Sequence, residues 1–515
     1  MEQQRRTSSR RNNRNQISTN GALANQLSFQ NVKSDLAPIA PLSADQLEAV
    51  HQQSLKIISQ LGVKVLCPDF RQQLKLAGCE VDDAEEMVRM APELTEMMVA
   101  KAPNEFTLTP RNPSRALKIG GNNINFGLVS GPPNVHDTIN GRRAGNFEDF
   151  KNLIKLGQSF NSIHFMGNQA CGTNDLPVNT RHLDSLQATI MLSDKITSTM
   201  SIGAGRVRDA VNMLAIARGI SREELAKSPT AMTNINVNSP RILDKEMSSA
   251  DLELASAGQA VVVTPFTLMG AMTPVSFAAA LAQQNAEALF TIAAIQSQYP
   301  GAPVIYGGFT SNVDMKSGAP AFGTPENSRA NMVGGQLARR YGLPYRTSAC
   351  NAANVVDGQA AYETQMALWG AVMGHGNLVY HGAGWLEGGL VASFEKIVMD
   401  AEMLQMMMST ITTPKITDDE FAFDAMEEVG EGGHFFGCDH TLSRYKSAFY
   451  DPILSDWTNY ENWADQGQLT ATDRAAKIWQ EILKEFVPPA IDPAISEELD
   501  AYVRTRKEAL GTSDP

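Results

Sequence analysis

Residues 345–381 read YRTSACNAANVVDGQAAYETQMALWGAVMGHGNLVYH, and this stretch indicates the class of fold. β-Forming residues (345–349) are followed by a helical window (358–373) and then by a second run of β-formers (378–381). Strands that alternate with helices pair in parallel, because each helix carries the chain back to the edge where the next strand begins. The stretch therefore predicts a strand–helix–strand unit of an α/β protein.

The same alternation recurs along most of the chain. The predicted strands are Ile124–Val129, Ser162–Met166, Ile196–Ile202, Met232–Val237, Ala260–Phe266, Pro303–Phe309, Tyr345–Ala349 and Leu378–His381. The predicted helices are Phe147–Gln158, Thr180–Leu192, Arg206–Arg218, Asp244–Ala257, Ser276–Ser297, Pro325–Tyr341, Gly358–Met373 and Val391–Met408. Eight such units can close into a (β/α)8 TIM barrel, a fold of roughly 250 residues. A doubly wound open sheet is disfavoured, because no GxGxxG follows the first strand.

Changes in composition divide the chain into four expected segments. They are a disordered tail (1–40), an N-terminal helical cap (41–115), the (β/α)8 barrel (116–414) and a C-terminal helical extension packed on the barrel (415–515). In the cap, one helix is expected after Ser43 as N-cap, and another over residues 83–101. The extension is expected to contain two helices, Ala471–Phe486 and Ala494–Ala509. Its aromatic residues are interpreted as mostly structural: Tyr445, Phe449, Tyr450, Trp457, Tyr460 and Trp463.

Composition excludes several classes of protein. The chain has 515 residues, 43% of them hydrophobic, so it can bury a full core. A net charge of −13 argues against nucleic acid as the main partner, and no apolar run of transmembrane length is present. The five cysteines form no CxxC pair, which favours a reducing compartment. The Arg- and Ser-rich N-terminus could suit a mitochondrial transit peptide, but it lacks a helical apolar stripe, so a cytoplasmic tail is favoured.

The site of a (β/α)8 barrel lies at the C-terminal ends of its strands. The segments expected there are rich in Gly, Ser, Thr and Asn, and they lack the cluster of carboxylates or histidines that a catalytic metal needs. No metal is expected. The series His434, Cys438 and His440 resembles a zinc spacing but has no fourth ligand nearby.

The predicted strand ends do offer aromatic side chains, whose faces attract a quaternary ammonium by roughly 0.5–2 kcal/mol each. They are Phe126, Phe165, Phe266, Tyr306, Phe309, Tyr345, Tyr380 and Trp385. Aromatic residues of strands are more often part of the core. Two interpretations therefore stay open: some of these residues form a cage for a cation, or all of them pack in the core. Cys350 could serve as a nucleophile with His381 as its base, although a buried, inert cysteine is the commoner case.

Several separated motifs resemble the trimethylamine methyltransferase superfamily. They are Pro274–Glu287 (PVSFAAALAQQNAE), Asp357–Glu363 (DGQAAYE), Gly382–Gly388 (GAGWLEG), Gly131–Pro133 (GPP) and Gly433–Gly437 (GHFFG). The resemblance covers about residues 40–490 and implies a (β/α)8 barrel. It also implies transfer of a methyl group from a methylamine or quaternary amine to the Co(I) of a separate corrinoid protein, so that this chain itself binds no cofactor. A homo-oligomer is expected as well.

Members specific for trimethylamine carry pyrrolysine at the end of the seventh strand. Counting back from Asp357 places that position at Cys350, which cannot take over the role of pyrrolysine. The chain therefore resembles the pyrrolysine-free branch, which implies a substrate such as glycine betaine or a related betaine. The alternative is a catalytically silent barrel that binds a quaternary amine as a sensor or carrier.

A betaine has a cationic and an anionic end, and the expected site residues divide accordingly. Phe309, Tyr345, Tyr380 and Trp385 are expected to hold the cation. Arg346, His381 and Asn351 are candidate donors to the carboxylate, with Glu387 as a further polar contact or a hinge. Side chains alternate along a strand, so only one of Tyr345 and Arg346 can face the barrel interior, and His381 is the favoured donor.

Overall fold

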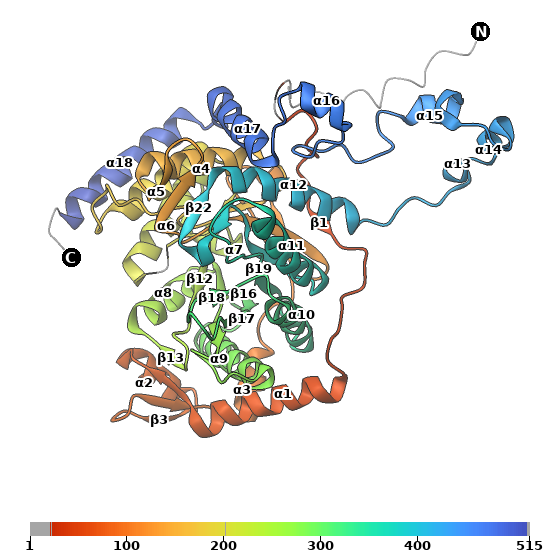
Figure 1. Cartoon of the computed structure of the whole chain (residues 1–515). Coiled ribbons are helices and arrows are strands. Elements are labelled where there is room, and N and C mark those ends of the chain that lie inside the picture. The colour runs from red at the N-terminus through yellow and green to blue at the C-terminus, as the bar shows by residue number, and fades with distance from the viewer. Residues whose placement is uncertain (1–20, 22, 201, 512–515) are drawn as a thin grey trace, which may run out of the picture.

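Eight short parallel strands form a ring in the order in which they occur along the chain (Figure 1). The computed structural model describes residues 21, 23–200 and 202–511. The strands are β7 (Asn123–Leu128), β10 (Phe165–Met166), β11 (Ile196–Thr197), β12 (Met232–Ile235), β14 (Ala260–Val263), β16 (Val304–Gly307), β19 (Tyr345–Ser348) and β20 (Leu378–Ala383). β20 pairs with β7, and a parallel bridge between Ser198 and Met232 joins β11 to β12. The predicted (β/α)8 barrel is confirmed, although β11 ends at Thr197 and is shorter than expected.

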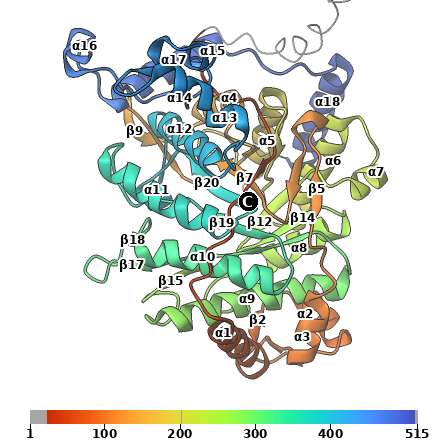
Figure 2. The ribbon, with the colours of Figure 1, turned by 90° about the vertical axis from the view of Figure 1, so that its right-hand side faces the viewer.

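Eight helices surround the strands, as predicted, and Figure 2 shows α9, α10 and α11 side by side. They are α4 (Phe147–Ser159), α5 (Arg181–Leu192), α6 (Ala204–Arg218), α8 (Lys245–Ser256), α9 (Phe277–Gln298), α10 (Pro325–Arg340), α11 (Gly358–Met373) and α12 (Phe394–Thr410). Side-chain caps fix several of their starts, because a Ser, Thr, Asn or Asp oxygen accepts a free N–H of the first turn. Asn146, Asp244, Thr324, Asp357 and Ser393 act in this way.

Side chains fill the interior of the barrel near the N-terminal ends of its strands, and that end of the barrel is closed. Inward-facing apolar side chains such as Phe165, Ile305 and Leu378 form one buried cluster. The hairpin of β5 (Phe106–Leu108) and β6 (Leu117–Ile119) adds its own apolar residues to that cluster. The C-terminal ends of the strands are therefore the end at which a ligand can enter.

Two small sheets extend the strands beyond the ring and build the mouth of the barrel. The first has β15 (Phe266–Met269), β17 (Phe309–Val313) and β18 (Pro320–Ala321). The second has β21 (Trp385–Leu386), β22 (Val391–Ser393), β8 (Asn134–Asp137) and β9 (Gly141–Ala144). The predicted strand 260–266 is thus two strands, and residues 391–393 form a strand rather than the start of the last helix.

The N-terminal region departs from the expected tail and all-helical cap. Residues 23–40 follow the barrel, with β1 (Val32–Lys33) paired to β7, so this part of the expected tail is ordered; residues 1–20 lie outside the described part of the chain. The cap contains α1 (Ala44–Lys56), α2 (Pro68–Leu76) and α3 (Pro92–Val99), with Ser43 in a capping box as expected. It also contains β2 (Val63–Val65), β3 (Glu80–Asp82) and β4 (Met87–Arg89). The helix expected over 83–101 is therefore wrong in its first half.

The two predicted C-terminal helices are present and pack on the barrel. α17 (Ala471–Glu485) packs against α12 and α4, and α18 (Pro493–Leu510) packs against α5 and α6. Tyr502 and Arg506 of α18 both donate hydrogen bonds to the Asp209 carboxylate of α6, at 2.8 and 2.7 Å. These bonds fix α18 to the outer wall of the barrel.

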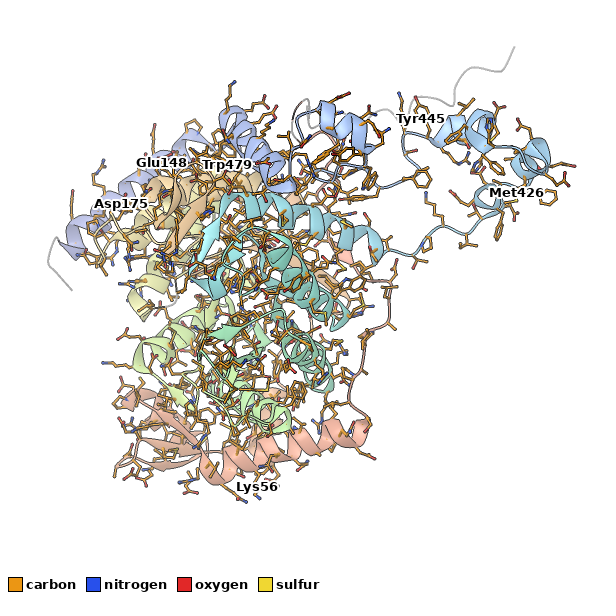
Figure 3. All side chains as sticks on the ribbon, in the orientation of Figure 1. Lys56, Glu148, Asp175, Met426, Tyr445 and Trp479 are labelled. Atoms are coloured by element: carbon orange, nitrogen blue, oxygen red, sulfur yellow. The ribbon has the colours of Figure 1, made fainter. Side chains whose placement is uncertain are left out.

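One part of the extension does not pack on the barrel. Residues 412–449 project away from the body, carrying α13 (Asp418–Phe421), α14 (Phe423–Val429) and α15 (Asp439–Arg444), and Figure 3 labels Met426 and Tyr445 on this projection. The interpretation of the six aromatic residues between 445 and 463 as mostly structural is wrong for four of them. Tyr445, Phe449, Trp457 and Tyr460 are exposed.

Among the described residues, none of the helices combines the length and the apolarity needed to traverse a bilayer.

Candidate functional site

A cavity of about 430 Å³ opens at the C-terminal ends of the strands. Its wall has an aromatic part, a polar part without carboxylates among the described residues, and one arginine. The lining residues are Ser130, Gly131, Asn168, Gln169, Ser198, Met200, Ile202, Asn234, Asn236, Met247, Phe266, Phe309, Phe322, Arg346, Tyr380, His381, Trp385, Gly388, Gly389 and Leu390. A larger groove of about 700 Å³ lies between α1 and α9, outside the ring of strands.

The aromatic part is a cluster of four rings from the two mouth sheets. The Phe309 ring lies 4.9 Å from Phe266, 5.4 Å from Phe322 and 6.2 Å from Trp385, measured between centroids. Phe322 and Trp385 meet edge to face at 90°. Aromatic faces arranged around a space of this kind attract a cation, most strongly where water is excluded. Phe309 and Trp385 are thus brought together at the cavity, as the sequence predicted.

Arg346 lies beside this cluster and carries a buried positive charge. Its guanidinium carbon is 4.6 Å from the Tyr380 ring centroid and 5.2 Å from that of Phe309. Nη1 donates one long hydrogen bond of 3.4 Å to the Gly308 carbonyl, and Nε is buried without a partner. Burial lowers the pKa of Arg346 to about 10, so the side chain stays protonated at neutral pH. No carboxylate of the described chain pairs with it, which leaves a cation ready to bind an anionic group.

Strand register decides between Arg346 and its neighbour Tyr345. Because successive side chains point to opposite faces, the inward position of Arg346 turns Tyr345 toward the helices. The Tyr345 hydroxyl donates to the main-chain oxygen of Asn331 on α10 at 2.9 Å. Burial raises the pKa of Tyr345 to about 12. Tyr345 therefore does not line the cavity, and its expected contact with the cation is corrected.

His381 lies at the cavity wall in a constrained conformation. Its φ is 55°, and its ring centroid is 4.1 Å from that of Trp385. Nδ1 is buried without a hydrogen-bond partner. Burial, reinforced by the Arg346 charge, holds the pKa of His381 well below its usual value, so the ring is neutral at pH 7. A neutral imidazole donates more weakly to a carboxylate than a guanidinium does, so Arg346 rather than His381 is the stronger candidate donor.

Asn351 and Glu387 do not line the cavity. They form hydrogen bonds that hold neighbouring parts of the cavity wall in place. Asn351 Nδ2 donates to the Trp385 carbonyl at 2.6 Å, and the Trp385 indole N–H donates back to the Asn351 carbonyl at 3.1 Å. Asn351 therefore positions Trp385. Glu387 accepts from Nε of Arg142 at 3.0 Å and ties the Trp385 loop to β9. Their expected direct contacts with substrate are corrected to positioning contacts.

Cys350 is fully buried behind the cavity wall, in an apolar cluster that includes Leu368 and Ala371. Burial raises the pKa of the thiol, so it remains protonated and is a poor nucleophile. It does not line the cavity, and the structure gives it no base in His381. The nucleophile reading of Cys350 is not supported.

If the activity is the methyl transfer that the sequence motifs imply, Cys350→Ala will retain it within about tenfold, or about 1.4 kcal/mol in the activation free energy. The reason is that the thiol neither reaches the cavity nor ionises at neutral pH. Initial rates at saturating substrate check this, with the melting temperature as the control for the small cavity left by the substitution. A loss of a thousandfold at unchanged folding would contradict it.

A buried ion pair supports the loop that carries Trp385. Lys396 and Asp400, one turn apart on α12, pair with each other and are both buried. The second carboxylate oxygen of Asp400 accepts the Gly384 N–H at 2.8 Å, and Lys396 Nζ donates to Thr364 on α11 at 2.9 Å. The pair thus fixes the backbone one residue before Trp385.

The expected sites did not include Phe322 or the polar wall formed by Ser198, Asn168 and Asn234. Phe322 follows β18, in the glycine-containing loop after the sixth strand, and no periodicity indicates which way such a residue points. Asn168 stands just after the predicted strand Ser162–Met166, and that position is the signal that identifies it. Asn234 lies within β12, where only the inward side of the strand brings it to the cavity. For the described residues no group of three or more His, Cys, Asp or Glu side chains could hold a metal ion. Cys438 donates instead to the Phe435 carbonyl.

The chain was compared with known families and proteins. A family model described as trimethylamine methyltransferase (MTTB) matches residues 6–511. The chain is 35% identical to the glycine betaine methyltransferase of Desulfitobacterium hafniense strain Y51, over 91% of this chain and 98% of that protein. It is 26% identical to the trimethylamine methyltransferase MttB of D. hafniense strain DSM 10664 / DCB-2, over 92% and 95% of the two chains.

Solved structures of a methylamine enzyme also match. The monomethylamine methyltransferase MtmB of Methanosarcina barkeri aligns with a TM-score of 0.45 and 10% identity, over 88% of this chain and 92% of that one. A hydroxylamine complex of MtmB aligns with a TM-score of 0.48 over the same shares of the two chains. The family model spans nearly the whole chain, and the betaine enzyme is similar over almost its full length. The chain therefore belongs to the trimethylamine methyltransferase family.

Proposed function

We propose that this protein transfers a methyl group from a betaine to the Co(I) of a corrinoid carried by a separate protein. One observation carries the choice of a betaine over a simple methylamine. Arg346 is a buried cation without a carboxylate partner among the described residues, and it stands against the Phe309 ring of an aromatic cluster. Trimethylamine has no group for such a cation, whereas a betaine has a carboxylate for Arg346 and an ammonium for the rings.

The distances fit a short betaine. The guanidinium carbon of Arg346 is 5.2 Å from the Phe309 centroid, so a carboxylate bound to Arg346 lies next to the aromatic faces. In glycine betaine a single methylene separates the carboxylate from the trimethylammonium group. Both ends can therefore be bound at once, and the zwitterion compensates the buried charge of Arg346.

The reaction requires little acid–base catalysis from the protein. The N–CH3 bond breaks with its electron pair remaining on nitrogen, and Co(I) supplies the pair for the new Co–CH3 bond. The leaving group is a neutral tertiary amine, so no proton is needed. The role of this protein is to orient the substrate and to exclude water from the reacting methyl group. The neutral His381 and a cavity wall without carboxylates among the described residues are consistent with that role.

The similarity to a glycine betaine methyltransferase over nearly its full length supports this proposal. The corrinoid protein must approach the mouth of the barrel, because the hairpin of β5 and β6 closes the other end. All five cysteines are unpaired and buried, which fits the reducing cytoplasm where we place the protein.

The proposal is tested by methyl transfer to a reduced corrinoid protein and, in parallel, to free cob(I)alamin. With glycine betaine, the absorbance of Co(I) is expected to decay only in the presence of this protein, and dimethylglycine is expected to form in equal amount. Trimethylamine is the matched control and is expected to react far more slowly. Tight binding of glycine betaine without any transfer would support the non-catalytic carrier instead.

A further inference from the structure

The projecting segment of residues 412–449, here called the arm, has almost no core of its own. Only Ala425 and Cys438 are buried within it. Its large apolar side chains are exposed instead, among them Phe436 at 83% and Phe449 at 87%. The full set is Ile416, Phe421, Phe423, Met426, Phe435, Phe436, Leu442, Tyr445 and Phe449.

The arm cannot be stabilised by its own helices. α13, α14 and α15 have four, seven and six residues, which is too short for helices that stand alone in water. Where the arm returns to the body, Tyr450 donates to Glu402 of α12 at 2.8 Å, so its base is fixed. An ordered base that carries an uncovered apolar surface of this size indicates a protein partner.

The arm leaves the body at the closed end of the barrel. The Ile411 carbonyl, just before the arm, accepts from the N–H of Asp35 at 3.0 Å, and the neighbouring Ser34 N–H donates to Asn122, directly before β7. In Figure 1, α12 runs from β22 at the mouth to the arm on the opposite side. A protein that docks at the mouth therefore does not cover the arm.

The same chain exposes a second apolar surface along α11, which runs from the mouth of the barrel to the closed end. Tyr362, Met366 and Trp369 lie at i, i+4 and i+7 on α11, and all three are exposed, so they form one outward stripe. The stripe continues into the exposed Ile39, whose N–H donates to the Met373 carbonyl at the end of α11. These residues are called the α11 stripe.

We propose that the arm of one copy covers the α11 stripe of a second copy, and the reverse, in a twofold dimer. Both surfaces belong to one chain, so two copies can exchange them about a twofold axis, with the arm of each on the stripe of the other. The nine apolar side chains of the arm present roughly 1,000 Å², from ~150–250 Å² for each aromatic residue, which exceeds the ~800 Å² that each partner of a stable interface buries.

Charge is complementary as well. Seven of the residues 418–431 are Asp or Glu, and none is Lys or Arg. Arg339, exposed beside the end of α11, donates to the Gly374 carbonyl at 2.8 Å and forms no ion pair with another described residue. The acidic arm of a second copy would supply its counter-charge.

The test is the mass of the full chain in solution at micromolar concentration, by light scattering after gel filtration. The wild type is expected to be a dimer, and both Phe436→Asp/Phe449→Asp and Tyr362→Asp/Trp369→Asp are expected to be monomers. Leu76→Asp and Ile139→Asp, at exposed apolar residues away from both surfaces, are the matched controls and are expected to remain dimers. All substituted side chains are exposed, so circular dichroism should show folded proteins.

Mixing the two monomeric variants provides an internal check. A mixed dimer has one intact arm–stripe contact, so partial reassociation is expected in the mixture and in neither variant alone. A monomeric wild type, or a dimer that survives the arm substitutions, would overturn the proposal. Dissociation by the arm substitutions alone would also overturn it, because the stripe would then not be the covered surface.

Discussion

Arg346→Met will weaken the binding of glycine betaine by at least about thirtyfold, or ~2 kcal/mol, and will leave the binding of choline unchanged or tighter, because choline no longer meets the like charge of the guanidinium. Methionine keeps an unbranched apolar stem as far as the position of Nε and removes the charged guanidinium group. Removing the partner of a buried carboxylate costs roughly 2–5 kcal/mol, because that carboxylate is left desolvated and unpaired. Choline carries the same trimethylammonium group without a carboxylate, so it loses nothing. Calorimetric titration of both ligands measures the difference.

The melting temperature of Arg346→Met separates a binding role from a structural one. In the free protein the guanidinium has one long hydrogen bond, to Gly308, and no counter-ion among the described residues. Burial of such a charge costs free energy, so the variant is expected to melt at the same temperature or higher. A lower melting temperature together with equal loss for betaine and choline would contradict the assignment of Arg346.

Lys396→Met will lower the free energy of unfolding by about 3–5 kcal/mol at pH 7, because it leaves the Asp400 carboxylate buried without its cation. Burial already raises the pKa of Asp400, and loss of Lys396 raises it further. A folded-state pKa above the unfolded value stabilises the protonated form, so stability is lost as the pH rises. The deficit should be largest at neutral pH and should shrink as the pH approaches 4. Chemical denaturation at several pH values measures it.

The double variant Lys396→Met/Asp400→Leu is the control for this prediction. It removes both charges and should recover most of the lost stability, since replacing a buried pair by apolar side chains is often nearly neutral. It also removes the acceptor of the Gly384 N–H, so betaine binding should stay weaker than in the wild type. If the double variant is as unstable as Lys396→Met, the unpaired Asp400 carboxylate is not the cause of the lost stability.

The barrel could be predicted from sequence because its eight units repeat one pattern, a short run of β-formers followed by a capped helix. The ends of α10 and α11, with Thr324 and Asp357 as caps, lie within a few residues of the predictions. The small strands at the mouth and in the cap were missed, because pieces such as Met87–Arg89 are too short to show a period of two. Their pairing is set by tertiary contacts. The exposed arm was taken for a packed segment because aromatic residues are usually buried.

The site was partly predictable for a related reason. Position at a strand end identified Phe309, Arg346, Tyr380, His381 and Trp385, all of which line the cavity. Alternation required a choice between Tyr345 and Arg346, but only the register of β19 against β16 and β20 shows that Arg346 faces inward. Asn351 and Glu387 lie in loops, where spacing does not indicate direction.

Calorimetric titration with three ligands of nearly equal shape tests most directly whether the cavity binds both ends of a betaine. The ligands are glycine betaine, choline, which lacks the carboxylate, and 3,3-dimethylbutanoate, which replaces the ammonium nitrogen by carbon. Simultaneous contact of Arg346 with the carboxylate and of the Phe309 cluster with the cation predicts that glycine betaine binds at least tenfold more tightly than either analogue. Equal affinity of either analogue would contradict this account.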